Sequence, residues 1–262
     1  MTDRKNNILK QDKDVYYGQL DAASATVGTM ELTLRQKVAL GARIVASDGQ
    51  GNGIAGQVSA RLEDSTFWTQ TFGLGFEEAK ASNQIRISPN LEVVEGDGKP
   101  NPGNRFHSYI YQRRPDVFAI VHTHAPYAMA LSMIGAPLIP SCMETIAIWN
   151  DIAHLPTWPG VPVGDEEGEI ISAALGEKRT ILLAHHGLLT VGKSIEEATA
   201  LAVIFELAAR LQLMAMPAGT IRPLPEHAAK EGYAFAAKPG YYKRRFQYLS
   251  RLVLAVDASC LE

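Results

Sequence analysis

The sequence contains little cysteine and no excess of positive charge. Cys142 and Cys260 are the only cysteines among 262 residues, and without C-x-x-C spacing they exclude a disulfide framework and a thiolate zinc site. The 25 Lys and Arg residues against 28 Asp and Glu give a formal net charge of −3, so no basic field attracts nucleic acid or anionic lipid. We therefore expect a cytoplasmic protein that binds neither nucleic acid nor membranes.

A third absence concerns charge within one segment, because residues 117–143 contain no Asp, Glu, Lys or Arg. This run is long enough to cross a membrane. Its prolines Pro126, Pro137 and Pro140 argue against a lipid-facing helix, since the backbone groups that they free need polar partners. We expect the run to be buried within protein. Residues 1–13 are polar with both charge signs, which predicts a loose tail rather than a secretory signal.

Helix and strand patterns alternate along the rest of the chain. Apolar periodicity and capping residues predict helices over 31–47, 104–113 and 194–214. Alternating or β-branched apolar residues predict strands over 57–62, 67–71, 84–87, 117–123, 180–184 and 188–191. This order predicts an α/β protein with a tail over 1–30, one domain over 31–216 and a C-terminal helical tail over 217–262. The last segment is expected to pack on the same domain or on a neighbouring subunit.

Two pairs of histidines stand at the ends of predicted apolar strands. His122 and His124 are two residues apart, and such residues of a strand point to the same face. His185 and His186 close a second strand, and Gly187 after them permits a sharp turn. Three imidazoles leave an open coordination position on a metal ion, which is typical of a catalytic site. The alternative is that these histidines are hydrogen-bonded core residues, and spacing alone leaves both interpretations open.

Five short motifs occur in an order that resembles one protein family. They are Gly-Ile-Ala-Gly-Gln-Val-Ser at 53–59, Arg-Phe-His at 105–107, Arg-Pro-Asp-Val at 114–117, Val-His-Thr-His-Ala at 121–125 and Leu-Leu-Ala-His-His-Gly-Leu at 182–188. Together they resemble the class II aldolase/adducin family over about residues 32–215. This family includes fuculose-phosphate aldolase, ribulose-phosphate epimerase and several metal-dependent decarboxylases.

The resemblance implies a three-layer α/β/α domain with a central, largely antiparallel sheet. It also implies a homotetramer with active sites between subunits and one divalent metal ion per subunit. It assigns this ion to His122, His124 and His186, with His185 packing as a neighbour. Zn²⁺ is the metal that we expect first, and Fe²⁺ and Mn²⁺ are alternatives because three imidazoles suit all of them.

The chain departs from the sugar-phosphate aldolases where those enzymes bind phosphate. Their Ser-Ser-Glu stretch is replaced here by Asn101, Pro102 and Gly103. The glycine-rich loop has Ile54 and Gln57 where they have Thr and Asn. A sugar phosphate is therefore not the expected substrate. The residues expected to bind a different substrate in this region are Gly56, Gln57 and Asn101.

A replacement for the missing glutamate lies just after the charge-free run. Glu144 falls where the family presents a catalytic tyrosine or aspartate from the adjoining subunit. Its sequence neighbours are apolar, and burial among them would raise the carboxyl pKa toward the range useful for acid–base catalysis. The alternative is that Glu144 only forms a salt bridge. Tyr127, Tyr241 and Tyr242 are further candidates as proton donors.

These residues predict a metal-dependent carbon–carbon lyase that cleaves a 2-oxo or hydroxy-carboxylate by retro-aldol reaction or decarboxylation. Phe72, Phe106 and Trp149, expected around the site, favour a carboxylate or aromatic small molecule as substrate. The main alternative is a non-haem Fe(II) oxygenase that decarboxylates an aryl 2-oxo acid oxidatively, because one branch resembles this chain in Asn-Pro-x-x-Arg-Phe-His and Val-His-Thr-His-Ala-Pro. A third interpretation is a non-catalytic interaction module, but adducin-like heads lack the histidine set.

Overall fold

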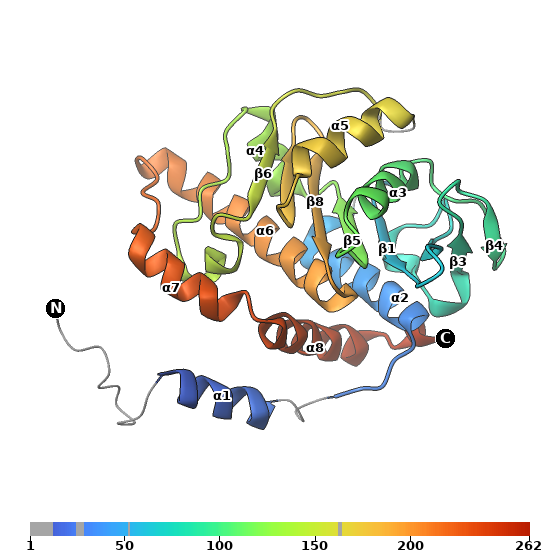
Figure 1. Ribbon diagram of the computed structural model, residues 1–262, viewed down its shortest axis with the longest axis horizontal. Coiled ribbons are helices and arrows are strands. Elements are labelled where there is room, and N and C mark those ends of the chain that lie inside the picture. The colour runs from blue at the N-terminus through green and yellow to red at the C-terminus, as the bar shows by residue number, and fades with distance from the viewer. Residues whose placement is uncertain (1–12, 25–28, 52, 162–163) are drawn as a thin grey trace.

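The computed structural model describes residues 13–24, 29–51, 53–161 and 164–262 (Figure 1). Within these residues one sheet has eight strands in the order β4-β3-β2-β1-β5-β8-β7-β6. All neighbouring strands are antiparallel except β6 and β7, which are parallel. The strands are β1 (Gln57–Arg61), β2 (Phe67–Gln70), β3 (Gln84–Ile87), β4 (Val93–Glu95), β5 (Ala119–Thr123), β6 (Ile152–Leu155), β7 (Thr180–Leu183) and β8 (Gly187–Gly192).

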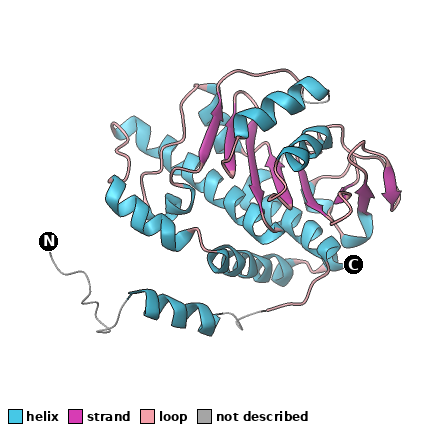
Figure 2. Cartoon of the chain, in the orientation of Figure 1, coloured by secondary structure: helices cyan, strands magenta, loops and turns pink. Residues whose placement is uncertain are grey.

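Helices cover both faces of this sheet, which confirms the predicted three-layer α/β/α domain (Figure 2). On one face α3 and α5 pack through Ile110 and Ile171 against Ile120 of β5. On the other face lie α2, α4, α6 and α8. The helices are α1 (Lys13–Ser24), α2 (Leu34–Val45), α3 (Asn104–Arg113), α4 (Pro126–Met133), α5 (Asp165–Leu175), α6 (Ile195–Ala215), α7 (Glu226–Ala236) and α8 (Pro239–Val256).

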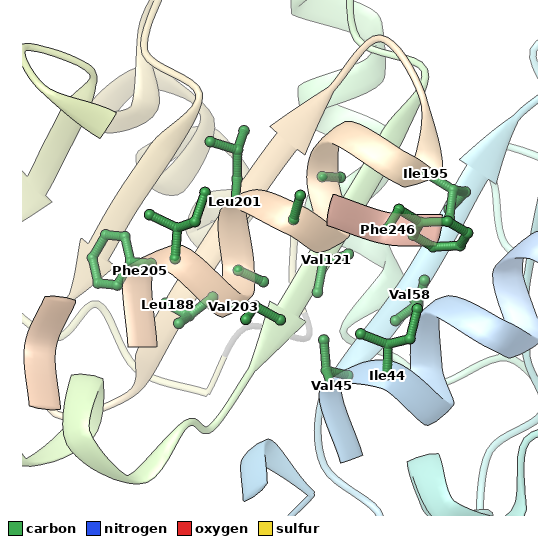
Figure 3. Close-up of a cluster of buried hydrophobic side chains, with 14 of the residues drawn as sticks. Ile44, Val45, Val58, Val121, Leu188, Ile195, Leu201, Val203, Phe205 and Phe246 are labelled. Carbon is green, nitrogen blue, oxygen red and sulfur yellow. The ribbon is translucent and has the colours of Figure 1, made fainter. Parts of the chain in front are cut away.

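The larger hydrophobic core lies between the sheet and α6 (Figure 3). Val58, Val121 and Leu188 come from the three adjacent strands β1, β5 and β8. They form one cluster with Leu201 of α6 and with Phe246 of α8. The C-terminal helix α8 therefore packs on the body of its own chain, against α2 and α6.

Helix α6 is apolar around most of its circumference. The segment Ile195–Ala218 has the length and composition of a membrane-spanning helix. Most of it is buried, and it contacts β5, β8, α2, α4 and α8. A helix that is apolar on every side is typical of the centre of a large core. Ser194 and Glu197 have the sequence spacing of a capping box, and Ser194 is the N-cap. The side chain of Glu197 instead accepts from the backbone N–H of Lys193, so the box is not completed.

β5 lies at the centre of the sheet between β1 and β8, and its side chains alternate between the two cores. The strand begins later than predicted, at Ala119, because the N–H of Val117 closes a turn on the carbonyl of Arg114 at 3.0 Å. The charge-free run continues into α4 and then reaches the surface, where Met133 and Ile134 are 67% and 57% exposed. The prediction that this run is completely buried is therefore wrong for the single chain.

Several elements were not predicted. α1 forms inside the expected N-terminal tail, and its Tyr17 ring lies 4.1 Å from the ring of Phe235 on α7. β6 is short and half-buried, so neither an apolar run nor strict alternation marks it. Three acidic residues open α5, where they match the positive end of the helix dipole. The helix buries only one side and therefore has few apolar positions. The acidic residues at its start hide the apolar periodicity that would have predicted it.

Candidate metal centre

Three histidine side chains converge where the end of β5 meets the turn between β7 and β8. His122 lies in β5, His124 follows the strand, and His186 precedes β8. One ligand nitrogen from each lies within 4.8 Å of the other two, and the ring centroids are 4.7, 4.8 and 5.2 Å apart. The three side chains expected to bind metal are thus brought together from one chain.

Two glycines allow the surrounding backbone to approach the end of β5. Gly187 has a φ of +149°, and a Cβ there would overlap the carbonyl oxygen of Thr123. Gly56 has a φ of +93°, and its Cβ would lie 2.7 Å from the carbonyl oxygen of His122. A larger residue at either position would push its loop away from the histidines.

The orientation of the His122 ring is fixed by a backbone carbonyl. Its Nδ1 lies 2.8 Å from the carbonyl oxygen of Leu188, which can only accept a hydrogen bond. Nδ1 therefore carries the proton, and the lone pair of Nε2 is available to a metal ion. The Phe106 ring packs edge-to-face with this imidazole, with centroids 5.1 Å apart.

The electrostatic environment keeps these imidazoles neutral. Burial lowers the pKa of His122 well below its usual value, and the neighbouring His186 and His124 lower it further. Burial and the proximity of His124 lower the pKa of His186 to about 4. Burial also lowers the pKa of His124. Neutral imidazole is the form that coordinates metal, so the donor set fits one divalent cation near neutral pH.

The histidines form the floor of a cavity of about 370 Å³. Gln57 and Asn101 also line it, and no acidic or basic side chain, histidine apart, does so among the described residues. Its rim is apolar and exposed to solvent. The rim residues, with their exposed fractions, are Ile54 (49%), Phe72 (49%), Trp158 (50%) and Val161 (62%).

The cavity contains most of the side chains expected around the substrate. Gly56, Gln57 and Asn101 line it, as do Phe72 and Phe106. Gln57 is buried, and its amide lies so close to Gly103 that a Cβ there would come within 2.8 Å of Nε2. The amide thus fills space beside Gly103, the last residue of the Asn101–Gly103 stretch.

Trp149, which was expected beside the cavity, does not line the cavity of its own chain. Its ring packs 6.0 Å from the ring of Tyr233 on α7, and it is not a lining residue. Trp158 takes that place instead, from the loop after β6. The sequence Thr-Trp-Pro-Gly at 157–160 marks an aromatic residue in a loop, but it does not indicate which site the loop reaches.

Glu144 does not line the cavity of its own chain. It lies in the short 3₁₀ helix Met143–Ile148, where Thr145, Ala147 and Ile148 turn inward and Glu144 is exposed. The burial that we inferred from its apolar sequence neighbours was therefore wrong for the single chain. Its predicted role from an adjoining subunit stays a prediction.

The candidate tyrosines also lie away from the cavity. The ring of Tyr127 is covered by the guanidinium of Arg210, whose Cζ is 5.5 Å from the ring centroid. The hydroxyl of Tyr242 is buried and donates to the carbonyl of Ala147 at 3.3 Å. Tyr241 packs against Tyr242. None of the three faces the histidines within this chain, so their expected role as proton donors has no geometric support here.

Two further histidines lie near the site without joining the three. His185 lines the cavity in a left-handed conformation with φ +53°, which is uncommon for a residue with a side chain. His107 of α3 is fully buried, and its Nδ1 lies 2.7 Å from the hydroxyl of Ser59. That hydroxyl lies 2.8 Å from the phenol oxygen of Tyr111. Burial lowers the pKa of His107 to about 3, so it is a neutral core residue.

Comparison with known proteins finds relatives with similar sequences. The L-fuculose phosphate aldolase of Haemophilus influenzae is 31% identical over 177 residues, which cover 67% of this chain and 80% of that protein. The 4-hydroxy-3-prenylphenylpyruvate oxygenase/4-hydroxy-3-prenylbenzoate synthase of Streptomyces roseochromogenus subsp. oscitans is 27% identical over 183 residues, covering 68% and 66%.

A solved structure and a family model point to the same family as these relatives. The L-fuculose 1-phosphate aldolase from Glaciozyma antarctica PI12 superposes with a TM-score of 0.81 at 27% identity, covering 93% of this chain and 99% of that one. Residues 36–213 match the model of the class II aldolase and adducin N-terminal domain. The fold, the histidine arrangement and this match together establish that the chain belongs to the class II aldolase/adducin family.

Proposed function

We propose that this protein is a metal-dependent carbon–carbon lyase that acts on a 2-oxo or hydroxy-carboxylate. The observation that carries the proposal is the convergence of three neutral imidazoles, from His122, His124 and His186, on the floor of one cavity. A divalent cation there, Zn²⁺ or alternatively Fe²⁺ or Mn²⁺, would polarise a substrate carbonyl and stabilise the negative charge that develops as the carbon–carbon bond breaks.

The cavity lining supports a substrate without phosphate. Among the described residues no lysine or arginine lines the cavity, so a phosphate dianion would lack a cationic partner. The Gln57 amide occupies the space beside Gly103. The exposed apolar rim, including Phe72 and Trp158, instead suits an apolar or aromatic group next to the carboxylate.

Oxidative decarboxylation of an aryl 2-oxo acid by an Fe(II) enzyme is the second candidate. A specific observation favours it, namely the similarity to a relative whose name describes both an arylpyruvate oxygenase and a benzoate synthase. Three imidazoles suit Fe²⁺ as well as Zn²⁺, and the aromatic rim suits an aryl group in either reaction. A non-catalytic, adducin-like role is the least supported, because the chain has all three histidines.

We also propose a homotetramer in the cytoplasm, with each site completed by Glu144 of a neighbouring chain. The exposed Met133, Ile134 and Met143 support an apolar contact between subunits. Glu144 would then move a proton to or from the substrate.

The deciding experiment combines metal analysis with oxygen measurements. Protein purified without oxygen is assayed for bound metal, then incubated with phenylpyruvate, 4-hydroxyphenylpyruvate and L-fuculose 1-phosphate, and products are identified by mass spectrometry. Cleavage of a 2-oxo acid under anaerobic conditions supports the lyase. Oxygen consumption equal to product formation contradicts the lyase and supports the oxygenase. Efficient turnover of the sugar phosphate contradicts the proposed substrate class.

A further inference from the structure

The metal ligand His124 lies outside the hydrogen-bonded ladder of the sheet. The pairing of β5 with β8 ends at Thr123, and α4 begins at Pro126. The backbone that carries His124 therefore connects the end of the sheet to the first turn of α4. The contacts that fix the residues on either side contribute to its position.

On the C-terminal side, the anchor is a buried carboxylate from a distant helix. The N-cap of α4 is Ala125, whose side chain cannot accept the free N–H groups of the first turn. Glu206 of α6 accepts them instead, through Oε1 from Tyr127 at 2.8 Å and Oε2 from Ala128 at 2.9 Å. Each carboxylate oxygen thus receives one N–H at the positive end of the helix dipole.

Burial of the Glu206 carboxylate costs free energy unless specific partners bind it. Glu206 is only 4% exposed and lies on the mostly buried helix at the centre of the core. A buried carboxylate is stable only when hydrogen bonds replace its water. The two N–H groups supply such bonds. Burial and the nearby charge of Asp48 raise the pKa of this carboxyl, whereas these two bonds and the guanidinium of Arg210 lower it.

On the N-terminal side, a second anchor leads to the same helix. The hydroxyl of Thr123 donates to Oε1 of Gln50 at 2.7 Å. The Nε2 of Gln50, which is fully buried, donates in turn to the carbonyl of Ala202 at 3.3 Å. Ala202 and Glu206 are four residues apart and lie on one side of α6. One face of α6 therefore holds both ends of the segment that carries His124.

We propose that Glu206 is a positioning residue of the metal centre. Through the first turn of α4 its carboxylate fixes the backbone of His124, and it thereby sets metal affinity and coordination geometry from the opposite face of the sheet. This inference rests on the proposed metal centre, but it requires no knowledge of the substrate. The replacement of Glu206 by glutamine would turn one acceptor oxygen into an NH₂ group that faces a backbone N–H.

The test compares Glu206→Gln with Glu196→Gln, a control on the same helix whose carboxylate pairs with Lys37 at 2.8 Å. The Kd for Zn²⁺ is measured by chelator competition, and the visible absorption spectrum of the Co²⁺-loaded protein reports coordination geometry. We expect Glu206→Gln to weaken Zn²⁺ binding about 10-fold and to shift the Co²⁺ bands. The control should change the Kd less than about 2-fold. A folded Glu206→Gln protein with wild-type Kd and spectrum would overturn the proposal.

A measurement on the wild-type protein keeps the proposal testable if the variant does not fold. Hydrogen exchange of the Tyr127 and Ala128 amides should be slow because both donate to a buried carboxylate. Exchange at the rate of exposed amides would contradict the anchor. The variant His122→Ala distinguishes a failure of this proposal from a failure of the metal centre. If both variants retain wild-type Zn²⁺ affinity, the metal centre itself is wrong. If only Glu206→Gln retains it, only the positioning role is rejected.

Discussion

At the scale of single residues, burial gives the three imidazoles their donor character. His122 is 1% exposed and directs Nδ1 to a carbonyl, so only Nε2 remains for coordination. Its low pKa keeps the ring neutral without any metal. The same burial that makes a charged imidazole costly therefore prepares a neutral one to bind a cation.

We predict that His122→Ala abolishes stoichiometric metal binding. The ring is one of three donors, and two imidazoles without it cannot hold a divalent ion tightly. Metal content after dialysis, measured by plasma emission spectrometry, should fall from about one ion per chain to near zero. His227→Ala is the matched control because His227 is exposed on α7, and it should retain the metal.

A second prediction concerns acid stability and the buried His107. Its folded pKa of about 3 lies below the unfolded value of 6.5, so the unfolded chain binds the extra proton between these values. Stability is therefore lost as pH falls below 6.5. Between pH 7 and pH 5 this group alone should lower the free energy of unfolding by about 2 kcal/mol.

Urea unfolding of metal-free protein at several pH values measures this effect. His107→Asn keeps a polar atom near the hydroxyl of Ser59 but does not titrate. Its free energy of unfolding should therefore depend less steeply on pH than that of the wild type. Equal slopes for the two proteins would show that His107 is not the buried neutral group described above.

Sequence reasoning located the histidines but not their whole environment. Side chains two residues apart in a strand point to the same face. This local rule was enough to predict that His122 and His124 lie on one face. The role of His186 rather than His185 came from family resemblance, because spacing does not distinguish adjacent residues. Trp158 and Glu206 were missed because each reaches the site from an element far away in sequence, and only the packed fold brings them near.

At the scale of elements, the site depends on close contacts between loops and the end of β5. The glycine-rich loop reaches β1 through Gly56, which touches the backbone of His122. The turn before β8 reaches the same strand through Gly187. The two loops flank the histidines from both neighbouring strands, so either loop can disturb the site.

We predict that Gly56→Ala damages the metal centre whereas Gly53→Ala does not. Both glycines have positive φ, at +93° and +75°, so both variants carry backbone strain of about 1–3 kcal/mol. Only at Gly56 does the new methyl group also meet the His122 carbonyl, since no atom of the described residues lies within 4 Å of a Cβ at Gly53. Zn²⁺ affinity should fall in Gly56→Ala alone. Equal affinities would show that the close approach is unimportant.

The strong elements of this fold were predictable and the weak ones were not. α2 has a complete capping box between Thr33 and Gln36, and β5 begins with the apolar residues Ala119, Ile120 and Val121, so local signals agreed with the final structure. β6 lies at the edge of the sheet and is half-buried along its length. Its strand conformation comes from pairing with β7, which no local pattern records.

At the scale of the whole molecule, one arginine joins the sheet to the helices at the end remote from the three histidines. Arg179 precedes β7 and forms ion pairs with Asp151 at 2.5 Å and Glu197 at 2.6 Å. Its guanidinium also donates to the hydroxyl of Tyr233 on α7 at 3.1 Å. The strands β6 and β7, α6 and α7 therefore meet at one charge network, in which Asp151 is buried and the other members are partly buried.

We predict that Arg179→Met destabilises the protein without changing metal affinity. Removing the cation leaves Asp151 and Glu197 without their shared partner, which typically costs about 3–5 kcal/mol in a buried network. Chemical denaturation should show this loss, and chelator competition should give the wild-type Zn²⁺ affinity. Arg222→Met, at an exposed position, is the control and should match the wild type in both measurements. Weakened metal binding in a folded Arg179→Met protein would contradict the independence of the two ends.

A final prediction tests the proposed sharing of sites between chains. If Glu144 serves the metal of a neighbour, the inactive variants Glu144→Gln and His122→Ala should recover activity when they are co-expressed, because some mixed sites contain both intact residues. Light scattering should give four times the mass of one chain. Recovery should not occur when the double variant is co-expressed with His122→Ala. Persistent inactivity of the mixture would show that Glu144 does not act across subunits.

The central position of β5 has a consequence for how the ion enters and leaves. Because β1 and β8 pair with this strand on both sides, its histidines are held by the fold and do not wait for a cation to order them. We expect apo protein to remain folded and to take up Zn²⁺ in a single rapid step, unlike domains that fold around their ion. The bound metal could then be exchanged while the protein stays folded. Which metal occupies the site would therefore depend on which metals the cell supplies at the time.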